Sequence, residues 1–303
     1  MKNLIYISII SGLLLFSCNG KQTNTESQDI NSILAEETNE TELAISEESM
    51  NDIIQSLPSP LEIATLIKES GIRFNKNFLN PTENADNYST DTDKALAMGI
   101  YSGDLGYINI YEKSTTAISY LGTVKKIADD LKIGQFFDIE LIKRIASNSK
   151  KLDSLLYIST ISFEKMDRYL REQKRSKLSV LLVTGTWLES VYLATEVVNN
   201  APNKDLFDRI AEQKTVLDQI LLIVSAYEAD PFFDDLNQKL NKLKAEYDKV
   251  TIEYNYVEPE TKEVNGRLVI VDNSTTTVKM TDEQLFNIRQ IIKQIRTDII
   301  SSS

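Results

Sequence analysis

Apolar residues recur every third or fourth position through much of the chain, and this spacing gives an α-helix one buried face. Residues 151–173, 177–199 and 205–227 each follow it. A further stretch, 230–250, opens with an Asp-Pro pair and then alternates three- and four-residue steps between apolar residues, as in a coiled-coil stripe. The pattern therefore predicts a series of successive helices in the second half of the chain.

The first half of the sequence predicts helices from their start and stop signals. Residues 59–62 (Ser-Pro-Leu-Glu) combine an N-cap serine, proline at the first helical position and glutamate at the capping-box position. Gly71 is expected to end this helix. Further helices are predicted over 92–111 and 114–132, the second with Gly134 as its stop signal.

The period changes before the last predicted helix, which begins at the capping box of Thr281. Leu268–Val271 and Thr275–Lys279 are rich in β-branched residues, with turn signals at 265–266 and 272–273. These residues predict a small β-hairpin or an irregular flap within 251–280.

Together with a shorter helix that Asp138 is expected to cap, these elements predict an all-α protein. Short connections favour antiparallel neighbours, so we expect an antiparallel multi-helix bundle or short helical array of about eight helices. The hairpin or flap precedes its C-terminal helix.

The first seventeen residues have the pattern of an export signal. Lys2 is followed by an apolar run from Leu4 to Phe16, which is too short to span a bilayer comfortably. The run ends in Leu-Phe-Ser-Cys at 15–18. The alternative is an ordinary secretory signal with a buried free cysteine at Cys18.

Residues 15–18 resemble the lipobox of bacterial lipoproteins. The resemblance implies cleavage between Ser17 and Cys18, a diacylglyceryl group on the Cys18 thiol and acylation of the new amino terminus. By analogy with enterobacterial sorting, Asn19 implies transfer to the outer membrane. The expected location is the cell envelope, with a lipid anchor at Cys18 and no nucleic acid as partner.

Ala95–Gly134, with Tyr-Leu at 120–121 and Leu-Lys-Ile-Gly at 131–134, is similar to uncharacterised helical lipoproteins of Bacteroidota. That resemblance implies no activity.

Residues 19–57 are polar, with scattered single aliphatic residues and no aromatic residue. Such a stretch buries too little apolar surface to offset the ordering of its backbone, although a weak helix within 29–56 is an alternative. We expect a signal peptide over 1–17, a flexible polar tether over 18–57 and a helical domain over 58–303.

Composition excludes several kinds of chemistry. The chain has 45 acidic and 33 basic residues, a formal charge of -12, no histidine and one cysteine. The charge disfavours nucleic acid. Without histidine the chain can form no Ser-His-Asp relay and no His-ligated metal site, and a lone cysteine makes no internal disulfide. We predict no catalytic constellation, no metal site and no cofactor.

The predicted helix 92–111 contains three glycines, Gly99, Gly103 and Gly106, although glycine destabilises a helix interior. Close approach of a neighbouring helix is the favoured explanation, and a ligand groove is the alternative. The same helix carries the candidate binding-groove residues Tyr101, Asp104, Tyr107 and Tyr111. Tyrosine offers an apolar face with a polar tip, but half-buried core positions are the commoner outcome.

Glu189, Tyr192 and Glu196 share one helical face by their spacing. Paired carboxylates could bind a divalent cation or transfer protons. We expect a solvated face instead.

The leading functional hypothesis is a membrane-anchored, non-enzymatic helical binding or scaffold module whose partner is another envelope protein or an envelope polymer. The first alternative is a carboxylate-dependent hydrolase or lyase acting on envelope glycan, which requires two carboxylates within about 5–10 Å in a cleft. The second is a carrier for an apolar ligand, which requires a cavity of about 300 Å³ or more.

Overall fold

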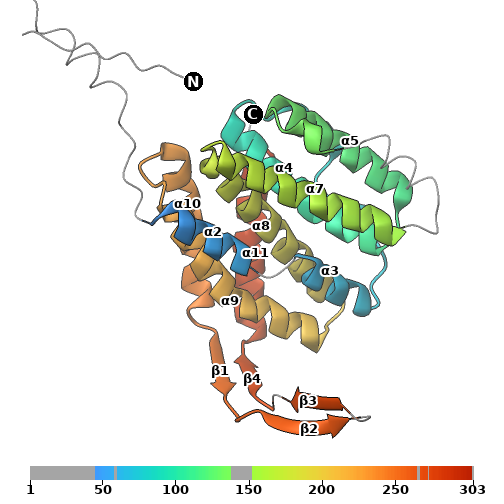
Figure 1. The fold of residues 1–303 in the computed structure, drawn as a ribbon, viewed down its shortest axis with the longest axis vertical. Helices are drawn as coiled ribbons and strands as arrows, with labels where there is room; N and C mark the ends of the chain where they lie inside the picture. The colour runs from blue at the N-terminus through green and yellow to red at the C-terminus, as the bar shows by residue number, and fades with distance from the viewer. Residues whose placement is uncertain (1–44, 58–59, 138–151, 265–266, 272, 302–303) are drawn as a thin grey trace, which may run out of the picture. The chain divides into compact units, whose positions relative to one another are not determined.

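The computed structural model describes residues 45–57, 60–137, 152–264, 267–271 and 273–301 (Figure 1). It is mostly helical, with two small antiparallel strand pairs before the C-terminal helix, which confirms the predicted fold class. Residues 1–44, which include Ser17 and Cys18, and the predicted helix start at Asp138 lie outside the described residues.

The helices are α2 (Glu47–Ser56), α3 (Pro60–Glu69), α4 (Asp91–Ile110), α5 (Ser114–Asp130), α7 (Leu152–Glu172), α8 (Ser176–Asn200), α9 (Lys204–Ser225), α10 (Pro231–Tyr247) and α11 (Asp282–Ile300). Short 3-10 helices are η1 (Lys76–Phe78), η2 (Thr82–Asp86) and η3 (Gly134–Phe136). The strands are β1 (Thr251–Asn255), β2 (Glu260–Val264), β3 (Arg267–Val271) and β4 (Thr275–Lys279).

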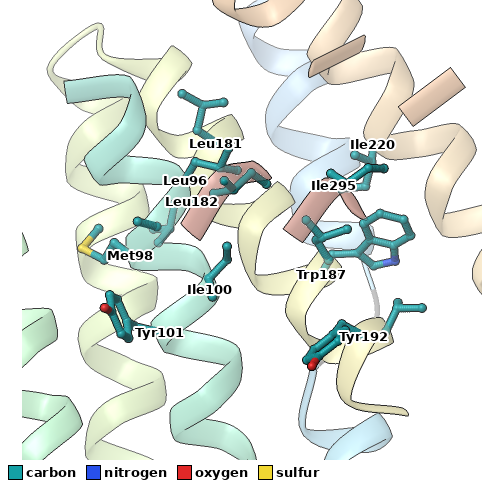
Figure 2. Close-up of a cluster of buried hydrophobic side chains, with 14 of the residues drawn as sticks. Leu96, Met98, Ile100, Tyr101, Leu181, Leu182, Trp187, Tyr192, Ile220 and Ile295 are labelled. Atoms are coloured by element: carbon teal, nitrogen blue, oxygen red, sulfur yellow. The ribbon is translucent and has the colours of Figure 1, made fainter. Parts of the chain in front are cut away.

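Helix α8 is the central element of the packing and is contacted by α3, α4, α7, α9 and α11. Within the described residues it alone is long and apolar enough to cross a membrane, but 89% of its most apolar window is buried against other helices. Its composition therefore reflects a place in the core. Figure 2 shows side chains of this core, among them Leu96 and Ile100 of α4, Leu182 and Trp187 of α8, Ile220 of α9 and Ile295 of α11.

Helices α4 and α8 cross closely because glycines face each other at the contact. A Cβ added to Gly99 would collide with the carbonyl oxygen of Leu182, and one added to Gly185 with that of Leu96. A Cβ on Gly103 would come within 2.7 Å of the Glu189 side chain, whereas one on Gly106 meets nothing within 4 Å. The packing explanation is therefore confirmed for Gly99 and Gly103 and does not apply to Gly106.

Helix boundaries follow local capping chemistry. Thr90 and Thr281 both form capping boxes, the second as predicted. The stop after α5 differs from the prediction, because the residue with positive φ is Lys132 (φ 59°) and not Gly134. Its successor, Ile133, donates its N–H to the carbonyl of Ala128, which closes a Schellman-type turn.

The packed body begins earlier than the predicted boundary at residue 58. The Ser46 hydroxyl accepts the N–H of Ser49 and starts α2, so the weak helix considered within 29–56 is present over Glu47–Ser56. Met50 is fully buried and lies 3.5 Å from the Tyr227 hydroxyl. The last part of the predicted tether is thus a packed helix. A few apolar residues at helical spacing are enough to hold such a helix when the rest of the domain buries them.

The strands form an arm of two consecutive hairpin segments, which we call the β-arm (residues 251–279). β1 pairs with β4, from Thr251 opposite Lys279 to Asn255 opposite Thr275. Farther out, β2 pairs with β3. Figure 1 shows both strand pairs beyond the end of α11, away from the helices. Ile252 and Val278 pack against the core and fix the base of the arm.

Candidate functional site

Three charged side chains from three helices meet inside the body; we call Asp104, Glu189 and Arg296 the buried ionic cluster. Asp104 and Glu189 are 0% exposed, and Arg296 is 6% exposed. The guanidinium of Arg296 donates from Nε to Glu189 Oε2 (2.5 Å) and from Nη2 to Glu189 Oε1 (2.9 Å) and to the Phe78 carbonyl (3.0 Å). It also lies 4.1 Å from the Tyr192 ring centroid. Helices α8 and α11 and the η1 segment are thus fastened at one point.

The loop between η1 and α4 is attached to the same cluster through Asn80. Its backbone N–H donates to Asp104 Oδ2 (3.0 Å) and its side-chain amide to the Tyr88 hydroxyl (3.1 Å). Its carbonyl accepts from the Tyr120 hydroxyl (2.8 Å). Asn80 is itself fully buried, so the cluster organises a loop as well as three helices.

The cluster contains two carboxyl groups and one guanidinium, and its charges balance when Asp104 is protonated. Burial raises the pKa of Asp104 well above its usual range, and the nearby charge of Glu189 raises it further. Burial lowers the pKa of Arg296, but Glu189 more than compensates and the net shift is upward. A neutral Asp104 beside a Glu189–Arg296 ion pair is the arrangement this environment favours.

The four predicted groove residues do not line an open groove. Tyr101 and Asp104 are completely buried, as is Tyr107, and each tyrosine hydroxyl is bonded to backbone. Tyr101 donates to the Pro81 carbonyl (2.7 Å), Tyr107 accepts from the Asn75 N–H (2.9 Å) and Tyr111 donates to the Ile72 carbonyl (2.8 Å). They hold the segment before α4, and three of them are core positions, the commoner outcome expected from the sequence for such tyrosines.

The expected solvated face at Glu189 and Glu196 is wrong. Glu189 is buried in the ionic cluster, and Glu196 is only 6% exposed. Glu196 receives two hydrogen bonds from Arg289 of α11, at 2.9 and 3.2 Å. The sequence spacing correctly placed both carboxylates on one helical face. The arginines that neutralise this face lie about a hundred positions away in the chain, so the spacing could not identify them as partners.

A carboxylate-dependent hydrolase needs its acid pair in a cleft that substrate can enter. Asp104 and Glu189 are close enough to influence each other's charge, but both are enclosed by helices. Among the described residues no cluster of three metal-ligating side chains occurs either. The buried ionic cluster therefore acts in folding and offers no surface for catalysis.

The β-arm carries the main concentration of exposed apolar side chains. Five of the eight large apolar residues that are exposed in the described structure lie on it: Tyr254, Tyr256, Leu268, Val269 and Ile270. Leu268 is 78% exposed and Ile270 76%, values far above those of core residues. The sequence predicted this segment as a hairpin but not as a surface. The feature of the sequence that could have indicated this surface is the unbroken apolar run of β3. A strand that is buried on one face only is expected to alternate apolar and polar residues.

Two hollows complete the candidate surfaces. One, of about 630 Å³, lies at the base of the arm and is lined by Val278 of β4, Phe207 of α9, and Leu285, Phe286 and Arg289 of α11. The other, of about 670 Å³, lies between α2, α3, α4, α7, α8 and α9. Its volume meets the requirement set for a carrier of an apolar ligand.

Comparison with protein-family models, curated proteins and solved structures gives no match to this chain.

Proposed function

We propose that this protein is a lipid-anchored, non-enzymatic binding module of the cell envelope that holds another envelope protein on its β-arm. One observation carries the proposal. Strand β3 presents Leu268, Val269 and Ile270 to solvent at the outer end of an arm whose base is packed in the core. Exposed apolar patches of this kind mark interaction sites, because leaving them in water is unfavourable.

The two outer strands differ in how their edges are protected. β2 carries the exposed charged residues Glu260 and Lys262, which form an ion pair at 3.1 Å and discourage pairing with a foreign strand. Residues 268–271 of β3 are all aliphatic. β3 is therefore the edge open to strand addition, in which backbone hydrogen bonds supply affinity and side-chain pockets supply selectivity.

The chemistry of the surface favours a protein over a glycan as partner. Aliphatic side chains such as Leu268 and Ile270 bury well against another apolar protein surface, whereas a sugar polymer would require polar groups among the apolar ones. The hollow at the base of the arm adds Phe286, which is 54% exposed. Its ring gives the partner an aromatic contact beyond the strand edge.

The lipobox resemblance at 15–18 supports the anchor. Each buried methylene contributes roughly 0.8 kcal/mol, so two or three acyl chains on Cys18 make membrane attachment long-lived. In this proposal, the residues between Cys18 and α2 connect the lipid anchor to the binding module.

Site-specific photocross-linking in living cells tests the partner. A photoreactive residue at Ile270 should give one discrete product that contains a second, different protein, whereas the same residue at Leu222, an exposed leucine on α9 (46% exposed), should not. Leu268→Glu with Ile270→Glu should abolish capture of that protein by a tagged chain, and Leu222→Glu should preserve it. Equal products at both positions, or a product formed only with a second copy of this chain, would contradict the proposal.

A further inference from the structure

The hollow enclosed by α2, α3, α4, α7, α8 and α9 has a buried wall and an exposed rim. Leu105 (1% exposed) and Trp187 (6% exposed) form part of the wall. Glu164 and Arg168 of α7 are exposed and lie at the rim. At about 670 Å³, its volume falls within the range of small-molecule sites, about 300–1,000 Å³.

Asn109, near the end of α4, supplies the polar group of this wall. Its side chain is 7% exposed, and among the described residues neither its amide oxygen nor its amide nitrogen has a hydrogen-bond partner. No other described side chain leaves two buried polar atoms unsatisfied. Because an unpaired buried amide destabilises a fold, such a group facing a cavity indicates a ligand that completes its hydrogen bonds.

The other uncharged polar groups of the wall already use their donors. Trp187 Nε1 donates to Gln213 Oε1 (3.1 Å), and the Ser190 hydroxyl donates to the Thr186 carbonyl (2.8 Å). The Ser102 hydroxyl donates to the carbonyl of Met98 (2.8 Å). Arg171 Nη1, the other lining atom without a hydrogen bond, is held in the ion pair with Asp167. Among the uncharged side chains, recognition of a polar group therefore falls mainly to Asn109, which offers one acceptor and one donor group side by side.

The charges that line the cavity cancel. Three acidic residues, Glu62, Glu164 and Asp167, face three basic residues, Arg168, Arg171 and Arg209. Arg171 pairs with Asp167 at 2.8 Å and Arg209 with Glu62 at 2.7 Å. An ionised ligand would therefore lose its hydration in a lining that carries no net charge.

We propose that this cavity binds a small molecule with an apolar body and an uncharged, amide-like head that hydrogen-bonds to Asn109. Gly106 gives the cavity its room at the α4 wall, since a side chain there would project into open space. The site is separate from the β-arm and from the function proposed for it.

Trp187 provides a direct readout, because it is the only tryptophan of the chain and lies in the cavity wall. The full chain with Cys18→Ser, which has no acyl group of its own, is titrated with dodecanamide while Trp187 emission is recorded. Native mass spectrometry counts the bound molecules. Dodecanoate, which has the same apolar body with a charged head, is titrated in parallel. Saturable binding of one dodecanamide, at least about tenfold tighter than dodecanoate, is expected.

Two variants locate the ligand. Gly106→Leu should weaken dodecanamide binding at least about tenfold by filling the cavity, and Asn109→Leu should weaken it by up to about tenfold through loss of the head-group hydrogen bonds. Gly122→Leu is the matched control, because Gly122 is an exposed glycine of α5 at which an added Cβ also meets open space. It should bind as the unsubstituted chain does.

Three results would overturn the inference. They are the absence of any dodecanamide binding, an equal or greater affinity for dodecanoate, and undiminished binding by a folded Gly106→Leu chain. Should Gly106→Leu fail to fold, Asn109→Leu and the comparison of the two head groups decide the matter. Failure here leaves cross-linking at the β-arm unaffected, so the two proposals are tested separately.

Discussion

At the scale of single residues, the fold depends on a small number of buried charges that compensate one another. Glu189 is neutralised by Arg296, and Glu196 by Arg289. Such pairs contribute little by themselves, since removing two ions from water costs about as much as their attraction returns, but breaking one leaves a bare charge in the core. The two arginines of α11 therefore favour packing of α11 against α8, because only there do they neutralise the two buried glutamates.

Arg296→Met should lower the free energy of unfolding by about 3–5 kcal/mol, because Glu189 would lose its buried partner. Arg209→Met, which breaks partly exposed pairs with Glu62 and Glu212, should cost no more than about 1 kcal/mol. Urea denaturation measures both. Adding Glu189→Gln to Arg296→Met should recover part of the loss, and a double variant less stable than Arg296→Met alone would refute the charge argument.

Asp104→Asn should remove a pH dependence of stability. Burial, and after it the charge of Glu189, raises the pKa of Asp104 in the folded chain. The folded state then binds more protons than the unfolded state above the ordinary aspartate pKa of about 3.9. The contribution of this group to stability is thus complete below about pH 4 and is lost as the pH rises through the folded pKa.

The stability of the unsubstituted chain, measured relative to Asp104→Asn, should therefore fall as the pH rises above about 4. Asparagine at 104 still accepts the Asn80 N–H and cannot ionise. Urea denaturation of both chains at several pH values checks this prediction. A difference that is constant or increases with pH would show that Asp104 is ionised in the fold.

At the scale of elements, the crossing of α4 and α8 is the central contact of the body. Glycines at 99 and 185 allow the two backbones to approach, and most residues of each helix are then buried. Close packing against α8 explains why two of the three glycines of this twenty-residue helix, Gly99 and Gly103, are tolerated despite their low helix propensity. The third, Gly106, faces the cavity and has a different role.

Gly99→Ala should destabilise the protein by about 1–3 kcal/mol, because the added methyl group collides with the backbone of α8 and forces the helices apart. Gly106→Ala should instead stabilise it by up to about 1 kcal/mol, since alanine is the better helix former and the site is open. Thermal unfolding of the two variants gives the comparison. Equal effects at the two positions would exclude close packing as the reason for Gly99.

At the scale of the whole molecule, the helical body from α2 onward and the outer part of the β-arm differ in how they are packed. The body buries its core in its own helices, while the outer strands β2 and β3 lie outside that core. Folding and partner binding should thus be separable.

Replacing residues 256–274 with Asn-Gly, a two-residue turn suited to joining β1 to β4, should change the free energy of unfolding by less than about 1 kcal/mol. The same replacement should abolish capture of the partner protein. Val278→Asp, at the packed base of the arm, is the contrasting variant and should be clearly destabilising. Denaturation together with affinity capture checks both effects, and a large loss of stability on removing the outer arm would contradict the separation.

The proposed lipid anchor at Cys18 can be tested independently of the β-arm. Cys18→Ser should prevent lipid attachment, so that metabolic labelling with palmitate is lost and the protein appears in soluble fractions or as an unprocessed precursor. The folded body and its thermal transition should be unchanged. Unaltered labelling and membrane partitioning of the variant would refute lipidation at this residue.

Helices and their boundaries could largely be predicted from the sequence, because their causes are local. The spacing of apolar residues, the Asp-Pro start of α10 and the capping box at Thr281 each act over a few residues. The stop at Lys132 was misplaced, because positive φ was expected at a glycine and the chain adopts it at a lysine.

Contacts between elements distant in sequence determine the rest. The sequence around Glu189 does not indicate that Arg296 is its partner. Likewise, the sequence around Tyr101 does not indicate that its hydroxyl donates a hydrogen bond to the Pro81 carbonyl. The surface that lies opposite a polar side chain decides whether that side chain is solvated or buried. In the same way, it decides whether a glycine permits two helices to cross or leaves room for a cavity. Local patterns therefore specify the helices of this protein, whereas its buried charges, its exposed arm and its cavity arise from packing between distant segments.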